Sequence, residues 1–98
     1  MTIFKYTMTL EEKAFVEMPL GARVLSVGQQ DDPRKLVVWA IVDPARSEGR
    51  RCFRIFGTGH PFDLPSMDGT SPPFATFVGT VQTQLGLVWH VFDCGWAT

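Results

Sequence analysis

Hydrophobic and polar residues alternate with a period of two along most of this chain, and β-branched and aromatic residues are common in the alternating stretches. No window of the sequence repeats apolar residues at a helical spacing. The pattern predicts an all-β fold: a single compact antiparallel sandwich or barrel-like domain over residues 1–98, with about seven strands and at most one short helix. The strands are expected at residues 3–8, 14–18, 23–27, 35–43, 51–56, 74–83 and 87–93.

The connections between these strands contain residues that favour turns. Most are short and rich in Pro, Gly and Asp, as in antiparallel hairpins. Residues 57–73 are the exception, because this stretch is long and holds four of the seven prolines. It is either a functional loop or a simple return across the end of a sandwich. Residues 9–13 can form one helical turn, with Thr9 as N-cap and Glu12 completing a capping box.

Two predicted strands are apolar on both faces. Residues 36–42 are hydrophobic throughout, and residues 87–92 repeat the pattern with only His90 as a polar member. A two-layer sandwich needs one apolar face per strand, so the second face must be covered by a barrel turn, by the long loop or by another copy of the chain. Apolar burial contributes ~25 cal/mol per Å2, enough for contact between copies to stabilise an oligomer. We therefore expect a homo-oligomer.

Composition limits the class of protein. A chain of 98 residues with 45% hydrophobic residues has material for one core and no room for a second domain. Its net charge of −1 argues against non-specific nucleic-acid binding, which needs a basic excess. The first residues have neither a basic start nor a continuous apolar run, so we expect no signal peptide, no membrane span and a cytoplasmic location.

Cysteines and histidines are too few for a metal or disulfide framework. Cys52 and Cys94 lie far apart in the sequence, and we interpret both as reduced, packed side chains. His60 and His90 lack a convincing third ligand, so no metal is predicted, and no cofactor is predicted either. Catalysis has little support, because no two carboxylates have a spacing that indicates acid and base roles.

Positive charge is concentrated around the fifth predicted strand. Four of the nine basic residues, Arg46, Arg50, Arg51 and Arg54, lie close together there. On a strand, Arg50 and Arg54 share one face with Cys52 between them, while Arg51 lies on the opposite face. The cluster is either a solvated edge strand that charge protects from pairing with other sheets, or a pair of guanidinium groups for phosphate or carboxylate.

The sequence Gly57-Thr58-Gly59-His60 follows this strand directly. Its glycines can expose backbone N–H groups to an anion, Thr58 can donate from its hydroxyl, and His60 can bond to or stack on a ligand. It matches neither the P-loop nor the dinucleotide fingerprint. The alternative is a turn that contains Gly because its geometry demands positive φ. His90 is interpreted either as a core or interface histidine bonded to a backbone carbonyl, or as a residue that converges with His60.

The order of several segments resembles a family of small phage and prophage proteins known as a domain of unknown function. The most specific segments are F-R-I-F-G-T-G-H at residues 53–60, G-T-V at 79–81 and W-H-V-F at 89–92. The resemblance covers nearly the whole chain. It implies a phage or prophage origin and expression in the bacterial host cytoplasm, and it implies no activity. Residues 66–73 depart from the family pattern, which affects the placing of the loop residues.

These observations predict a small oligomeric binding protein, not an enzyme, that sequesters an anionic small molecule and so counters host defence. The expected ligand is a nucleotide or cyclic nucleotide signal, with an aromatic side chain stacked on its base. The predicted ligand-binding residues are Arg50, Arg54, Phe56, Gly57, Thr58, Gly59, His60 and Trp96. One alternative is a protein-interaction module that inhibits a host protein through Trp96, Phe62 and the proline-rich loop. A second is a small hydrolase of the same ligand that uses His60 or His90.

Overall fold

The computed structural model describes residues 1–30, 32–63 and 75–97. Within them the chain forms seven strands and no helix, which confirms the all-β prediction, and no segment there is a helix able to cross a membrane. Each predicted strand overlaps one of these seven; Phe74, the predicted start of the sixth, lies outside the described residues. The strands are β1 (Thr2–Thr9), β2 (Lys13–Pro19), β3 (Arg23–Gly28), β4 (Lys35–Val42), β5 (Glu48–Gly57), β6 (Thr76–Gln82) and β7 (Val88–Trp96).

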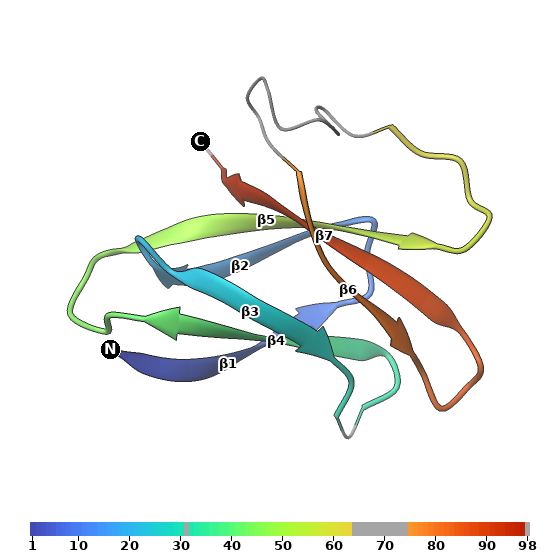
Figure 1. Cartoon of the computed structure of the whole chain (residues 1–98), viewed down its shortest axis with the longest axis horizontal. Coiled ribbons are helices and arrows are strands. Elements are labelled where there is room, and N and C mark those ends of the chain that lie inside the picture. Colours follow the sequence, from blue (N-terminus) through green and yellow to red (C-terminus); the bar gives the residue numbers. More distant parts are fainter. Residues whose placement is uncertain (31, 64–74, 98) are drawn as a thin grey trace.

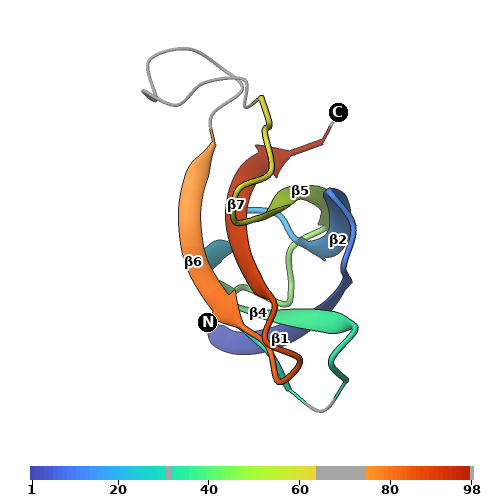
Figure 2. The same cartoon turned by 90° about the vertical axis from the view of Figure 1, so that its right-hand side faces the viewer.

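The strands form two antiparallel sheets that pack face to face as a sandwich (Figure 1). In the three-stranded sheet, β4 lies between β1 and β3, and the four-stranded sheet has the order β2-β5-β7-β6. At the edges of the sandwich β1 contacts β2 and β3 contacts β6, so the two layers meet along both sides. Figure 2 shows these layers from the side.

Tertiary pairing makes β5 and β7 longer than the alternation predicts. β5 begins at Glu48, before the predicted start at Arg51, because its first residues pair with the end of β2, where Pro19 lies opposite Glu48. β7 continues past Asp93 to Trp96, since an irregularity in the β5–β7 register admits an extra residue before pairing resumes. Partners in neighbouring strands therefore set these two boundaries.

The helical turn predicted at residues 9–13 is wrong. The chain makes a bend between β1 and β2, in which the Glu11 N–H donates to the Thr9 carbonyl at 3.0 Å. The Glu12 carbonyl accepts a hydrogen bond from the Ile55 N–H of β5, also at 3.0 Å. This bond extends the pairing of β2 with β5 to Glu12, so the segment is held in an extended conformation and not in the helical turn that a capping box needs.

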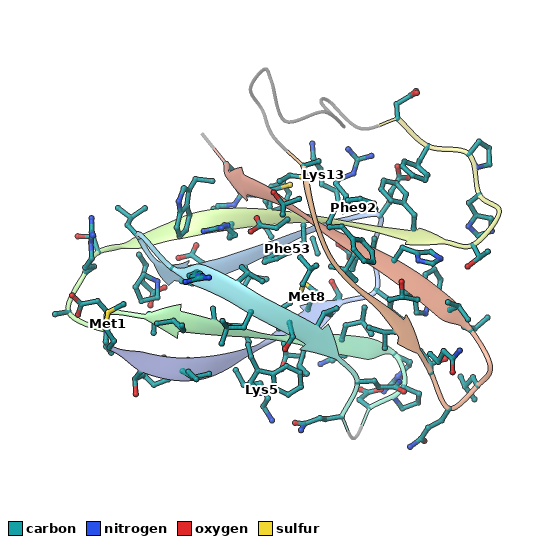
Figure 3. All side chains as sticks on the ribbon, in the orientation of Figure 1. Met1, Lys5, Met8, Lys13, Phe53 and Phe92 are labelled. Atoms are coloured by element: carbon teal, nitrogen blue, oxygen red, sulfur yellow. The ribbon has the colours of Figure 1, made fainter. Side chains whose placement is uncertain are left out.

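Apolar side chains from both sheets fill the space between the layers. The largest fully buried ones are Met8, Met18, Leu36, Val38, Val42, Phe53 and Val91. Figure 3 labels Met8 and Phe53 among the interior side chains. Burying a side chain of this size contributes roughly 1.5–3 kcal/mol, so this core is the main source of stability in the sandwich.

The second apolar face of β4 is covered in part by its own neighbours. Val37 points away from the core cluster, yet it is only 4% exposed. Trp39 packs over β3, where a Cβ on Gly28 would lie 3.1 Å from its ring. Lys5 Nζ donates to Gln30 Oε1 at 2.8 Å beside Val37. Contacts within the chain therefore account for part of the cover, and homo-oligomerisation stays a prediction.

Candidate ligand-binding site

The predicted site begins where β5 ends at Gly57 and the chain turns back toward His60. The His60 N–H closes this turn on the Gly57 carbonyl at 3.2 Å. Gly59 has a φ of 86°, which other residues adopt only with strain. Gly57 makes a close contact: a Cβ there would lie 2.9 Å from Nδ1 of the exposed His60 ring, so the imidazole rests directly on the backbone. The two glycines together bring His60 to the end of the sandwich.

Two hollows of about 260 Å3 each open beside the turn, and both have Gly57, His60 and Trp89 in their walls. The first is also lined by Phe56 and the second by Thr58. Four of the predicted residues therefore line a concave surface. Each hollow is slightly smaller than the usual range for ligand pockets, so it fits a single ring and not a large molecule.

Trp89, which lines both hollows, has a buried hydrogen-bond donor. Its indole packs against the core from β7, and its Nε1–H is buried with no partner among the residues that the structure describes. A buried donor without an acceptor costs roughly 1–3 kcal/mol. A ligand atom that accepts this hydrogen bond would remove the cost. Alternation alone assigns Trp89 to the core and contains no sign of its unpaired donor, so Trp89 is absent from the predicted site residues.

The two histidines contact different residues of the same turn. Thr58 Oγ1 lies 2.7 Å from Nε2 of His90, and Thr80 Oγ1 lies 3.0 Å from its Nδ1. The His90 ring is thus held by two hydroxyls, and the expected bond to a backbone carbonyl is wrong. This network ties the turn to β6 and β7, while His60 covers Gly57. Within residues 1–30, 32–63 and 75–97, no three His, Cys, Asp or Glu side chains are placed to hold a metal ion.

Arg54 lies beside the turn on the outward face of β5. Its Nη2 binds Glu12 Oε1 at 2.9 Å, and its guanidinium carbon lies 5.1 Å from the centroid of the Phe56 ring. Glu12 also lines the first hollow. Arg54 Nε is buried and has no partner in the described part of the chain. An anion that competes with Glu12 would meet the guanidinium at Nη2.

Arg50 and Trp96 do not join this group. At ~3.3 Å per residue, Arg50 lies more than ~20 Å from Gly57 along β5. Its guanidinium carbon is 4.0 Å from the ring centroid of Phe15, whereas Trp96 packs against the guanidinium of Arg51 at 4.6 Å. The structure gathers the other predicted residues at one end of β5: Arg54, Phe56, Gly57, Thr58, Gly59 and His60.

Phenylalanine rings cover the outward face of the four-stranded sheet next to Arg54. The rings of Phe56 and Phe62 stack with centroids 4.0 Å apart, and Phe92 lies 6.1 Å from Phe56 and 5.5 Å from Phe77. Phe56 is itself buried, whereas Phe62 and Phe77 are 42% and 55% exposed. These contacts cover much of the second apolar face of β7 and leave Phe62 as the exposed ring nearest the turn.

Comparison with known families places the chain. A model described as a domain of unknown function, DUF7352, matches residues 1–95. The chain belongs to this family. Searches among curated proteins and among solved structures gave no match. Membership of the DUF7352 family carries no activity with it, so the function has to be argued from the chemistry of the turn and its surroundings.

Proposed function

We propose that this protein binds a small anionic ligand of the nucleotide class at the Gly57–His60 turn and holds it without converting it. The Trp89 side chain carries the proposal, because it lines both hollows together with His60 and its buried Nε1–H lacks a partner among the described residues. A nucleobase is a flat ring with carbonyl and ring-nitrogen acceptors. It would fill a hollow of this size and pair with the indole, while His60 stacks on it at the rim.

The phosphate of such a ligand is expected to bind Arg54. The Glu12 carboxylate shows where an anion can bind, since it is held 2.9 Å from the Arg54 guanidinium and lines the first hollow. Because Glu12 is largely exposed, a phosphate can replace it without breaking a buried ion pair. Lys13, opposite Arg54 in the β2–β5 register, adds a second positive charge on this face. Arg favours phosphate because its planar fork of donors matches the phosphate oxygens.

The resemblance to phage and prophage proteins suggests a biological setting. A phage protein that sequesters a nucleotide or cyclic nucleotide signal in the bacterial cytoplasm would counter host defence by lowering the concentration of free signal. Binding alone is sufficient for this role. A homo-oligomer, which the doubly apolar strands favour, would carry several such sites in one particle.

Calorimetry with a panel of nucleotides and cyclic nucleotides tests the proposal. Wild type is compared with Trp89→Phe, which removes the indole N–H, and with Trp39→Phe, a matched change on the other sheet. We expect binding by wild type and by the Trp39 variant, and a loss of about tenfold in affinity for Trp89→Phe, the effect of one hydrogen bond. No heat with any panel member at tens of micromolar protein would reject the proposal. Equal affinity for both variants would remove Trp89 from the site.

Recovery of the bound nucleotide after denaturation separates sequestration from cleavage. A binding protein returns the ligand intact. A hydrolase that uses His60 or His90 would return products instead, and their formation would depend on incubation time.

A second candidate function is a protein-interaction module, which the exposed rings of Phe62 and Phe77 favour. Exposed aromatic side chains are frequent anchors of protein interfaces. Trp96, another predicted contact, is only partly exposed and packs on Arg51, and residues 64–73 of the proline-rich loop lie outside the described residues. Purification from a host lysate distinguishes the candidates. A stoichiometric protein partner that is lost in Phe77→Ser supports an interaction module, and its absence supports ligand binding.

A further inference from the structure

Cys52 and Cys94 are neighbours across β5 and β7, although they are distant in the sequence. Phe53 lies opposite Asp93 in the antiparallel register, and Cys52 and Cys94 are the next residues along the two strands. The register shifts between Arg51 and Phe53, so Cys94 and Gly95, whose φ is 82°, share the place beside Cys52. The two cysteines therefore meet at the bulge, one residue from a directly opposed pair.

Both cysteines belong to the outward face of the sheet. Cys52 pairs with Phe15 of β2 on that face, while its neighbour Phe53 enters the core. Directly opposed residues of antiparallel strands, such as the adjacent pair Phe53 and Asp93, have Cα atoms ~4.5–5.5 Å apart, and the Cα atoms of disulfides are ~4.4–6.8 Å apart. The next residues on these two strands therefore lie close to the separation that a disulfide requires.

The electrostatics of Cys94 agree with this proximity. Burial first, and then the charge of a Cys52 thiolate, raise the pKa of the Cys94 thiol to about 11; Asp93 also raises this pKa, while Arg54 and Lys13 lower it. One thiol affects the other in this way only when the two are close. At neutral pH Cys94 is thus a protonated thiol that persists until an oxidant reaches it.

We propose that Cys52 and Cys94 form a reversible cross-strand disulfide, a modification site that fastens β5 to β7. The oxidant is a low-molecular-weight disulfide such as glutathione disulfide. Cys94, the more exposed thiol, attacks it as the thiolate, releases one small thiol and forms a mixed disulfide. The Cys52 thiolate then attacks the Cys94 sulfur and displaces the second small thiol. The two protein thiols lose two electrons and two protons, and the small disulfide becomes two thiols.

The bond would join the two strands that carry the candidate site. β5 supplies Phe56 and Gly57, and β7 supplies Trp89 and His90. A cross-link between residues distant in the sequence stabilises mainly by restricting the unfolded chain, and the gain grows with the length of the closed loop. The oxidised protein should therefore have a higher Tm than the reduced protein. This inference does not depend on which ligand the turn binds.

Oxidation of the reduced, folded protein with glutathione disulfide at mildly alkaline pH tests the proposal. The intact mass should fall by two hydrogens, and peptide mapping without reductant should link the Cys52 peptide to the Cys94 peptide. The Tm should rise by about 10 °C or more, and dithiothreitol should reverse all three changes.

Cys52→Ser is the matched control, because it leaves Cys94 in place without a resolving thiol. This variant should stop at a glutathione adduct on Cys94, with no rise in Tm. The peptide map of the wild type does not depend on the folding of any variant. Two free thiols after prolonged oxidation, a persistent adduct on the wild type, or a link between two copies of the chain would each overturn the proposal.

Discussion

Two arginines close together on β5 meet carboxylates in opposite ways. Arg51 points inward, holds both oxygens of Asp93 at 2.9 and 2.7 Å, and donates to the Ala22 carbonyl at 2.9 Å. Arg54 points outward and binds one oxygen of Glu12 at 2.9 Å. The side chains of Arg51 and Asp93 are 13% and 11% exposed, whereas in the outward pair Arg54 is 18% and Glu12 67% exposed.

This difference separates a structural arginine from one that is available to a ligand. The inward pair has little contact with water, so removal of either partner leaves an uncompensated charge next to the core. In the outward pair the Glu12 carboxylate is solvated, so the single contact that it makes with Arg54 contributes little to stability. The face of the strand therefore decides the role of each arginine, although Arg51 and Arg54 are close neighbours in one basic cluster.

Asp93→Ala is expected to have the largest effect. It should lower the free energy of unfolding by about 3 kcal/mol, because it leaves the Arg51 guanidinium without its carboxylate in a site that water scarcely reaches. Glu12→Ala, the equivalent change in the outward pair, should cost no more than about 1 kcal/mol. Urea denaturation measures both. Equal losses in the two variants would contradict the distinction between the inward and outward pairs.

The rate at which Cys94 is alkylated measures how well the outward face of the four-stranded sheet shields this thiol from water. Burial, with the Cys52 charge as the second cause, raises the pKa of Cys94 from 9.0 to about 11. The thiolate is the reactive form, so at a given pH below 9 iodoacetamide should modify Cys94 about 100-fold more slowly than a thiol with the ordinary pKa.

The rate of this reaction should rise about tenfold per pH unit until the pH approaches the raised pKa. Mass spectrometry of the Cys94 peptide follows the reaction. The same protein unfolded in urea is the control and should regain the ordinary rate. A folded protein that reacts as fast as the unfolded one would show that Cys94 is not shielded.

The smallest expected effect concerns ligand binding by the outward arginines. Arg54→Ala should weaken nucleotide affinity by about tenfold, the effect of one charge-assisted hydrogen bond. Arg50→Ala is the matched control, on the same face of β5 but at its other end, and should leave affinity unchanged. Calorimetry measures both. An equal loss of nucleotide affinity in both variants would show that Arg50 also contributes to binding.

Alternation along the chain was enough to predict the seven strands and the faces of β5. Arg50 and Arg54 do share the outward face with Cys52, and Arg51 does lie opposite with Phe53. These features are local, because the period of two depends only on the geometry of an extended backbone. The same holds for Gly59, because a glycine in a turn is a local sign of the positive φ that the structure has there.

The composition of the site depended on contacts between distant segments. Arg50 and His60 are near each other in the sequence, but they lie apart in space because the extended strand β5 runs between them. The bend at residues 9–13 is not helical, because the Glu12 carbonyl bonds to β5. Neither feature can be predicted from the local sequence pattern.

Local residue patterns are enough to predict an all-β chain with seven strands, two distinct faces on β5 and a glycine turn at its end. Contacts between strands place Trp89 with His60 at the turn, bring Cys94 beside Cys52 at the bulge, and pair Asp93 with Arg51. Side-chain alternation is a property of one strand. Register, bulges and ion pairs belong to pairs of strands, and they are established only when the sheets assemble.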